Sequence, residues 1–214
     1  MWSNAEARPG GYIGIGLGGS AVNGTNVNTG YFSASNQPPG DANLLGTNLS
    51  KGASTLLNLG FNIKGYAAIE TALTGHGRNI TDQKNREWSA HWHSGVRVYP
   101  VWHWQQRLPE WLKPLEPSFF GGWGLSYQGY NPGTGGYNEV AWKTWKSMRL
   151  GTALEYYFPP YLKVGLDYSY IRAPYQTFIF NMSGRDSYDL NQSAVTHLHQ
   201  LFLFVSLHLW KDKA

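Results

Sequence analysis

Residues 161–171 read Tyr-Leu-Lys-Val-Gly-Leu-Asp-Tyr-Ser-Tyr-Ile, and no other stretch of the chain indicates its structure as clearly. Apolar or aromatic residues stand at every second position, with lysine, glycine, aspartate and serine between them. Successive side chains of a β-strand point to opposite faces of its sheet. The stretch therefore predicts a strand with one polar face and one apolar face, the latter made of Leu162, Val164, Leu166, Tyr168 and Tyr170.

The same two-residue alternation recurs about eight times, whereas helical 3.6-residue periodicity is almost absent. In residues 12–21, isoleucine and leucine alternate with glycine, which suits a narrow barrel with large side chains outside and glycine inside. We therefore predict an all-β fold, an eight-stranded antiparallel up-and-down transmembrane barrel. The expected strands are residues 12–21, 54–63, 66–74, 88–99, 118–128, 145–157, 161–171 and 195–210.

The composition favours a membrane over water as the surroundings of these strands. Charged residues make up 14% of the chain, against about 25% of a typical soluble protein, and aromatic residues make up 15%. Mean hydropathy is only −0.40, and no run approaches the roughly 18 to 20 apolar residues of a transmembrane helix. Transmembrane strands escape that test, because only every second residue faces lipid.

Several function classes are excluded by residue content. The chain has no cysteine, so disulfides, thiolate zinc sites and cysteine nucleophiles are ruled out. Its net charge of +4 is modest and its lysines and arginines are scattered, so nucleic acid is not an expected partner.

Connection lengths alternate along the expected strands, within a single domain of residues 1–214. Long loops are expected at about residues 22–53, 75–87, 129–144 and 172–194, with tight turns after the second and sixth strands. A tryptophan-rich, proline-broken segment at about residues 100–117 interrupts this rule, and we expect it to lie on the periplasmic side at the membrane interface. Long outer loops and short periplasmic turns are typical of outer-membrane barrels.

Six charged residues inside the expected strands fall on the face opposite the leucine, isoleucine, valine and tyrosine set. That face is also rich in glycine, whereas the apolar face carries aromatic residues near strand ends, as a membrane-interface girdle would. A soluble lipocalin-like barrel, with the apolar face inward, is the alternative fold. The charged residues are Glu70, Arg97, Arg149, Glu155, Lys163 and Asp167. The expected interface aromatics are Trp88, Trp92, Trp102, Trp104, Trp123, Tyr156, Tyr168 and Tyr170, with Trp111 as a further anchor.

The first and last strands carry a family resemblance. Residues 11–19 read Gly-Tyr-Ile-Gly-Ile-Gly-Leu-Gly-Gly, and residues 201–209 read Leu-Phe-Leu-Phe-Val-Ser-Leu-His-Leu. With these, nearly the whole chain resembles the small bacterial outer-membrane barrels of the OmpA transmembrane domain, OmpX and OmpW type. The last strand resembles the family's terminal insertion signal, through Leu201, Leu203, Val205, Leu207 and Leu209. Family members usually end on an aromatic residue, whereas here Leu209 takes that register and five residues follow it.

The resemblance implies a monomer in the bacterial outer membrane, exported by a cleaved signal peptide. Outer-membrane lipids, lipopolysaccharide and the barrel assembly machinery are its implied partners. The chain begins Met-Trp-Ser-Asn-Ala-Glu, without a basic and then apolar leader, so we expect the natural precursor to carry the signal and Met1 to be an expression start.

The inward charges are expected to pair with one another. An eight-stranded barrel is just wide enough for side chains to fill its interior, and a charge buried alone costs several kcal/mol. Our hypothesis pairs Glu70 with Arg97, and Arg149 with Asp167, as a plug that closes the lumen. An ion or proton path is the alternative.

Histidine and serine raise two further possibilities, a metal site and an enzyme. His91 and His93 share a strand face and could begin a transition-metal site, although hydrogen-bonded lumen histidines are favoured. His197 and His199 repeat the spacing near a loop and are expected at the surface. His93 and Ser94 suggest a nucleophilic pair, but adjacent strand residues point to opposite faces and cannot bond in that way. A serine from another strand could serve instead.

The sequence therefore predicts no catalytic, cofactor or metal site. The favoured function is non-enzymatic: a membrane anchor that displays its loops for envelope integrity or surface interaction. The first alternative is binding or passage of a small, apolar molecule through a narrow lumen or laterally through the wall, and the second is a lipid-modifying enzyme.

Overall fold

The structure is a computed structural model of the chain, and it describes part of the 214 residues. The described residues are 10–24, 50–63, 66–79, 86–100, 107–131, 140–158, 161–180 and 186–209.

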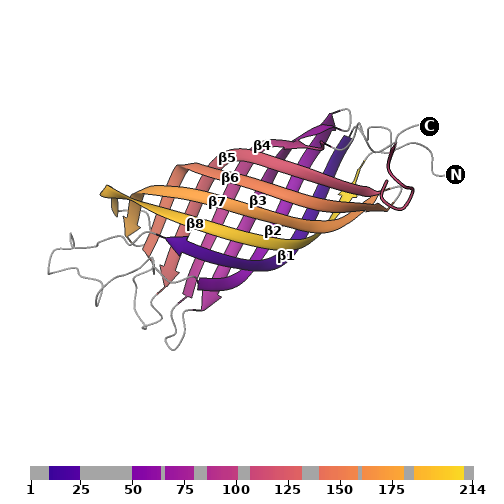
Figure 1. The fold of residues 1–214 in the computed structure, drawn as a ribbon. Helices are drawn as coiled ribbons and strands as arrows, with labels where there is room; N and C mark the ends of the chain where they lie inside the picture. The colour runs from indigo at the N-terminus through magenta and orange to yellow at the C-terminus, as the bar shows by residue number, and fades with distance from the viewer. Residues whose placement is uncertain are drawn as a thin grey trace.

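Within these residues, eight strands form one closed barrel in which each strand pairs antiparallel with the next and β8 pairs with β1 (Figure 1). The prediction of an all-β, eight-stranded antiparallel up-and-down barrel is confirmed. Among the described residues, no helix is both long and apolar enough to cross a bilayer. The strands are β1 (Gly10–Gly24), β2 (Ser50–Ile63), β3 (Ala67–Asn79), β4 (Arg86–Val98), β5 (Leu115–Asn131), β6 (Val140–Phe158), β7 (Leu162–Phe180) and β8 (Asp186–His208).

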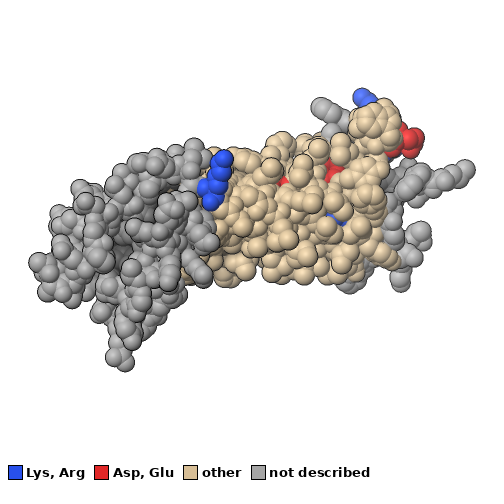
Figure 2. Space-filling model, turned by 90° about the horizontal axis from the view of Figure 1, so that it is seen from below, with Lys and Arg blue, Asp and Glu red and all other residues tan. Residues whose placement is uncertain are grey.

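The wall of the barrel is apolar on its outer face and polar on its inner face, the reverse of a water-soluble barrel. Leu17 and Leu203 are 72% and 62% exposed, while Arg97 and Arg149 are buried. Figure 2 shows the described wall as a broad tan band, with the largest charged groups at its two ends and only small areas of charge between them. The lipocalin-like alternative is wrong, because it requires the leucines to pack inside.

We name the two ends of the barrel by the connections that cross them. The loop end joins β1 to β2, β3 to β4, β5 to β6 and β7 to β8, and the turn end joins the other consecutive pairs. Because the strand number is even, β1 begins and β8 finishes at the turn end, where Tyr12 pairs with His208.

The strands extend further toward the loop end than predicted. The loop expected at 172–194 is mostly strand, since β7 continues to Phe180 and β8 begins at Asp186. The loops expected at 22–53, 75–87 and 129–144 likewise lose residues at both ends to the flanking strands. A strand needs only about 9 to 11 residues to cross a bilayer, and apolar alternation stops where lipid stops. Backbone pairing between strands continues beyond the lipid, but there the residues no longer alternate between apolar and polar.

The expected segment 100–117 is only partly described, and its last residues belong to β5. Pro117 pairs with Leu154 inside the β5–β6 ladder, whereas the sequence placed it at the end of the proline-broken segment. Proline is tolerated near the beginning of a strand, where a missing N–H costs least. Before it, residues 107–114 make turns in which Leu112 N donates to Pro109 O at 2.9 Å.

One bulge interrupts the β5–β6 ladder. Gly124 pairs with Ser147 and Ser126 pairs with Thr144, so β6 carries one extra residue there. Trp145 and Lys146 are both exposed, while Thr144 and Ser147 on either side are buried. The bulge therefore places two successive side chains on the outer face.

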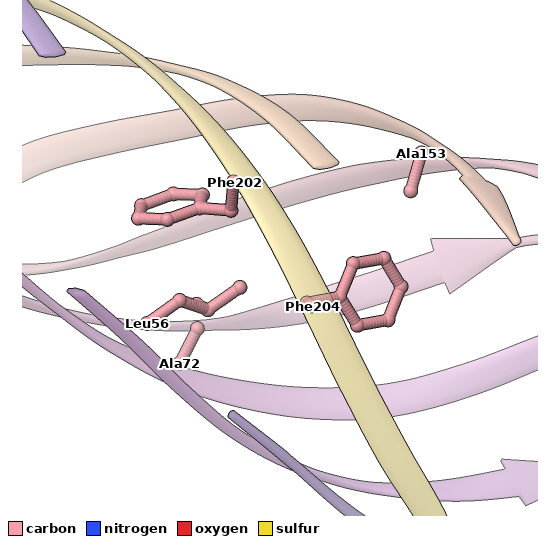
Figure 3. Packing of buried hydrophobic residues seen from close by; sticks show 5 residues of the cluster. All are labelled: Leu56, Ala72, Ala153, Phe202 and Phe204. Atoms are coloured by element: carbon pink, nitrogen blue, oxygen red, sulfur yellow. The ribbon is translucent and has the colours of Figure 1, made fainter. Parts of the chain in front are cut away.

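The middle of the lumen is filled by two inward phenylalanines of β8. Phe202 and Phe204 are buried and cluster with Leu56, Ala72 and Ala153 from other strands (Figure 3). Both phenylalanines alternate with the outward leucines of the last strand, so strand geometry turns them toward the lumen.

Candidate functional site

The candidate site is the network of charged side chains in the lumen. Arg97 of β4 donates from Nε to Glu70 Oε2 of β3 at 2.7 Å, and from Nη2 to Glu70 Oε1 at 2.8 Å. Arg149 of β6 donates from Nη2 to Asp167 Oδ1 of β7 at 3.1 Å. The structure therefore brings together the two pairs that were hypothesised from adjacent strands.

Further ion pairs cross the lumen between strands that are not neighbours. Arg97 Nη2 lies 3.1 Å from Asp167 Oδ2 of β7, and Arg97 Nη1 lies 3.6 Å from Glu155 Oε1 of β6. Arg149 Nη1 lies 3.6 Å from Glu70 Oε1. These contacts join opposite walls, so the network spans the lumen as well as lining it.

Lys163 continues the network toward the turn end. Its Nζ lies 2.9 Å from Glu155 Oε2 and 2.6 Å from Glu116 Oε2. The ammonium also lies 4.8 Å from the centre of the Tyr99 ring. Glu116 had been assigned to the segment before the fifth strand, and its inward position follows from the earlier start of β5.

Aromatic rings pack against the charges. Phe120 lies beneath both guanidiniums, with its ring centre 4.6 Å from Arg149 Cζ and 5.8 Å from Arg97 Cζ. Tyr12 donates its hydroxyl to Glu70 Oε2 at 2.6 Å, and its ring stacks on His208 at 5.6 Å.

Glycine makes room for one of these rings. A Cβ placed on Gly60 of β2 would lie 2.2 Å from Tyr12 Cζ, far inside van der Waals contact. Glycine at position 60 thus permits the Tyr12 ring to reach Glu70 across β2, and the neighbouring glycines of β1 and β2 belong to the same tight wall.

Together these contacts favour a closed lumen over an open one. Glu70, Arg97 and Arg149 are fully buried, and ions in such a place are stable only when paired and hydrogen-bonded. Moving any one of them to open a passage would leave its partners buried without compensation.

A neutral layer of histidine and serine lies nearer the loop end. His91 Nδ1 is 2.6 Å from Ser126 Oγ, Ser126 donates to Ser147 Oγ at 2.5 Å, and His93 Nε2 is 2.8 Å from that same Ser147. The two imidazoles stack at 6.2 Å, and His91 Nε2 also lies 2.9 Å from Ser89 Oγ.

Among the described residues this layer forms no three-ligand metal site, and it does not pair His93 with Ser94. Within the described part of the chain, no group of three or more His, Cys, Asp or Glu side chains is placed to hold a metal ion. His93 is buried, while Ser94 is exposed and lies 3.0 Å from Thr71 Oγ1 on the outer wall. The two residues face opposite sides, as strand geometry requires.

Hydrogen bonds also cross the lumen beyond the histidine layer. Thr196 of β8 donates to Gln128 Oε1 of β5 at 3.2 Å, and Gln200 donates to the carbonyl of Gly75 at 3.4 Å. Val22, Ile171 and Leu198 form a buried apolar cluster. Side chains therefore meet across the axis at several heights.

Those predicted interface aromatics that the structure describes lie on the outer wall. Trp92, Trp123, Tyr156 and Tyr168 are exposed, Tyr170 is half-buried, and Trp88 lies flat against Gly129 and stacks on Tyr127 at 5.5 Å. Trp111 is exposed in the turn before β5. Trp102 and Trp104 lie outside the described residues.

The predicted insertion-signal residues share the outer face of β8 and its end. Their large exposed fractions place them in the apolar band of the wall. They are Leu201, Leu203, Val205, Leu207 and Leu209.

The cross-lumen partners are what sequence reasoning missed. The alternation of a strand shows that a side chain points inward, and neighbouring strands suggest its lateral partner. The curvature of the wall decides which residues meet across the axis, and no local pattern encodes it. Glu116, Tyr12, Tyr99 and Phe120 were missed for this reason or because a strand began earlier than expected.

Comparison with solved structures shows which fold this is. Neisserial surface protein A is 10% identical, over 92% of this chain and 97% of its own, with a TM-score of 0.52. The outer membrane protein OprG of Pseudomonas aeruginosa is 8% identical, over 94% of this chain and 97% of its own, also with a TM-score of 0.52. The fold is that of a small outer-membrane β-barrel.

Sequence comparison adds nothing to this likeness. No family model and no curated protein matches the chain. The outer membrane protease OmpT of Escherichia coli is 7% identical, over 97% of this chain and 99% of its own, but its TM-score of 0.44 is too low to bear on activity here.

Proposed function

We propose that the chain is a non-enzymatic barrel of the bacterial outer membrane, which anchors its long connections at the cell surface. The observation that carries this proposal is the lumen network, in which the guanidinium of Arg97 contacts carboxylates from three other strands. A filled, ion-paired axis supports an anchoring role, because solute transport along the axis would need a water-filled passage.

The outer face supports the proposed location. Every strand of the wall exposes at least one leucine, isoleucine, phenylalanine or tryptophan side chain, and β7 exposes Leu166 together with Tyr168. A closed barrel with such a band satisfies its backbone internally and meets acyl chains with its side chains. On this proposal the chain is a monomer, exported by a cleaved signal peptide and inserted by the barrel assembly machinery.

Recording in planar lipid bilayers tests the proposal. The refolded chain, identified by heat-modifiable migration on a gel, is expected to insert without large ohmic channels. The Arg97→Ala variant is the informative comparison, because loss of the guanidinium removes the group that joins the walls, and any conductance should rise above that of the wild type.

Large, steady conductance from the wild-type barrel would refute the plug and favour transport along the axis. Solubility without detergent, with no heat-modifiable form, would refute the membrane location itself.

A further inference from the structure

Two histidines lie side by side on the outer face of β8. His197 and His199 are two residues apart, so their side chains point to the same face of the strand. Leu198 between them is buried in the lumen, and both histidines are half-buried on the outer wall. We name His197 and His199 the outer histidine pair.

The outer histidine pair lies just beyond the apolar band. The exposed leucines of β8 run from Leu209 at the turn end to Leu201, and a strand crosses a bilayer in about 9 to 11 residues. His199 is the next outward residue after Leu201, and His197 follows it toward the loop end. Both imidazoles therefore lie at a height where water and dissolved ions reach the wall.

Two tyrosines of β7 hold the imidazoles in place. Tyr168 Oη lies 2.8 Å from His199 Nδ1, and Tyr170 Oη lies 2.6 Å from His197 Nδ1. The Tyr170 ring also stacks on His197 at 5.9 Å and lies 5.2 Å from the His199 ring. Within the described part of the chain, Nδ1 is the ring nitrogen through which each of these histidines forms its hydrogen bond.

These bonds suit imidazoles that bind a metal ion through Nε2. A tyrosine hydroxyl can accept a hydrogen bond from Nδ1–H, and in that tautomer the lone pair of the neutral imidazole is on Nε2. Histidines that bind metals almost always donate their other ring N–H to an oxygen, which fixes the tautomer and the ring orientation. Tyr168 and Tyr170 can supply that oxygen to both members of the pair.

The lumen pair, His91 and His93, has the same spacing but differs in its surroundings. Both lumen histidines are buried, and His91 contacts a serine hydroxyl with each of its ring nitrogens. A metal ion could bind there only if those serine contacts were lost. The lumen pair is therefore a matched control for the outer one.

The donor atoms indicate which ions would bind. Imidazole nitrogen suits copper, zinc and nickel, and divalent copper binds nitrogen ligands most tightly of the three. In the described residues no group of three or more His, Cys, Asp or Glu side chains is placed to hold a metal, so the protein supplies two ligands and water the others. The exposed Arg172 pairs with His197 across the β7–β8 ladder, and its charge should weaken binding of a cation.

We infer that the outer histidine pair binds one divalent transition-metal ion, Cu²⁺ most tightly, through Nε2 of both imidazoles. The inference goes beyond the proposed anchoring function. It needs a folded barrel, and it does not depend on what the loops bind.

Titration of the refolded, untagged chain with Cu²⁺ in detergent micelles tests the inference. Electron paramagnetic resonance should show two equatorial nitrogen ligands, and isothermal calorimetry measures the affinity. His197→Gln/His199→Gln should abolish this binding. Tyr168→Phe/Tyr170→Phe keeps both ligands and should weaken binding by about 10- to 100-fold, because the oxygens that orient the imidazoles are lost. Arg172→Gln should tighten it.

The matched control removes the lumen pair instead. His91→Gln/His93→Gln should keep the wild-type affinity and the two-nitrogen spectrum. Fewer than two nitrogens in the wild type, or wild-type affinity in the variant of either outer pair, histidine or tyrosine, would overturn the inference. Heat-modifiable migration of each sample shows that the barrel has folded, and bilayer conductance tests the proposed function separately.

Discussion

Arg97 is the residue on which the lumen network depends most. Its guanidinium reaches Glu70, Glu155 and Asp167, and its Nη1 also donates to Ser118 Oγ at 2.9 Å. No other cation in the described lumen contacts as many carboxylates. Its fork of donors suits several carboxylates at once, which a lysine ammonium does not reproduce.

Replacement of Arg97 by methionine should therefore destabilise the barrel strongly. The variant leaves buried carboxylates without their cation, and such a loss costs about 3 to 5 kcal/mol of unfolding free energy. Urea unfolding of the refolded chain in lipid vesicles measures the change. Arg107→Met, at an exposed site outside the network, should stay within about 0.5 kcal/mol of the wild type. Equal effects of the two variants would contradict a structural role for the network.

Gly60 gives a second test at the scale of single residues. Alanine there drives its Cβ into the Tyr12 ring, which must move and lose its 2.6 Å bond to Glu70. Overpacking of this kind costs about 1 to 3 kcal/mol. Gly77→Ala is the matched control on the outer face, because a Cβ at Gly77 meets nothing within 4 Å. The same unfolding assay should separate the two, and a Gly77→Ala variant as unstable as Gly60→Ala would be the contrary result.

Some of these lumen contacts were predicted from the sequence, and others were not. Glu70 with Arg97, and Arg149 with Asp167, were hypothesised because inward charges on adjacent strands need partners. The contacts of Arg97 with Glu155 and Asp167 could not be foreseen, since they depend on how far β4 lies from β6 and β7 across a curved wall.

At the scale of the strand, the outer face of β8 shows best what surrounds the barrel. Leu203 is 62% exposed between Leu17 of β1 and Leu166 of β7, which are also exposed. In water such a stripe would be a large apolar patch, whereas against acyl chains it is the expected surface.

Arginine at position 203 should therefore be costly only in a bilayer. Near the midplane the substitution costs about 2 to 4 kcal/mol, and near the interface about 0 to 1 kcal/mol. Ala21→Arg, on the outer face near the loop end, serves as the interface control. Unfolding free energies in vesicles of defined thickness measure the difference. If Leu203→Arg and Ala21→Arg cost the same, the assigned height of the apolar band is incorrect.

The number of strands and the direction of their faces were predictable, but their ends were not. Alternation in β7 is clear from Leu162 to Tyr170, because lipid and lumen impose opposite demands on successive residues. Above that height β7 continues to Phe180 without the pattern. Interstrand hydrogen bonds between backbone groups maintain it there, and they leave no mark in the residue types.

For the whole molecule, the closed order β1 to β8 followed from two observations on the sequence. Long and short connections alternate, which is typical of up-and-down barrels of the outer membrane, and the strand count is even. The rule appeared to fail after the fourth strand, where residues 100–117 separate two strands. The structure shortens that exception by assigning Leu115 onward to β5.

The pairing of β1 with β8 has a consequence for how the gene could be rearranged. Leu209 N donates to Gly11 O at 2.8 Å, so the beginning of β1 and the end of β8 lie side by side. A linker of a few residues could join them there, and a new opening cut into one of the outer connections would leave all eight ladders intact. The cyclic order of the eight strands would stay the same in such a variant. Circularly permuted versions of the chain should therefore fold into the same closed barrel.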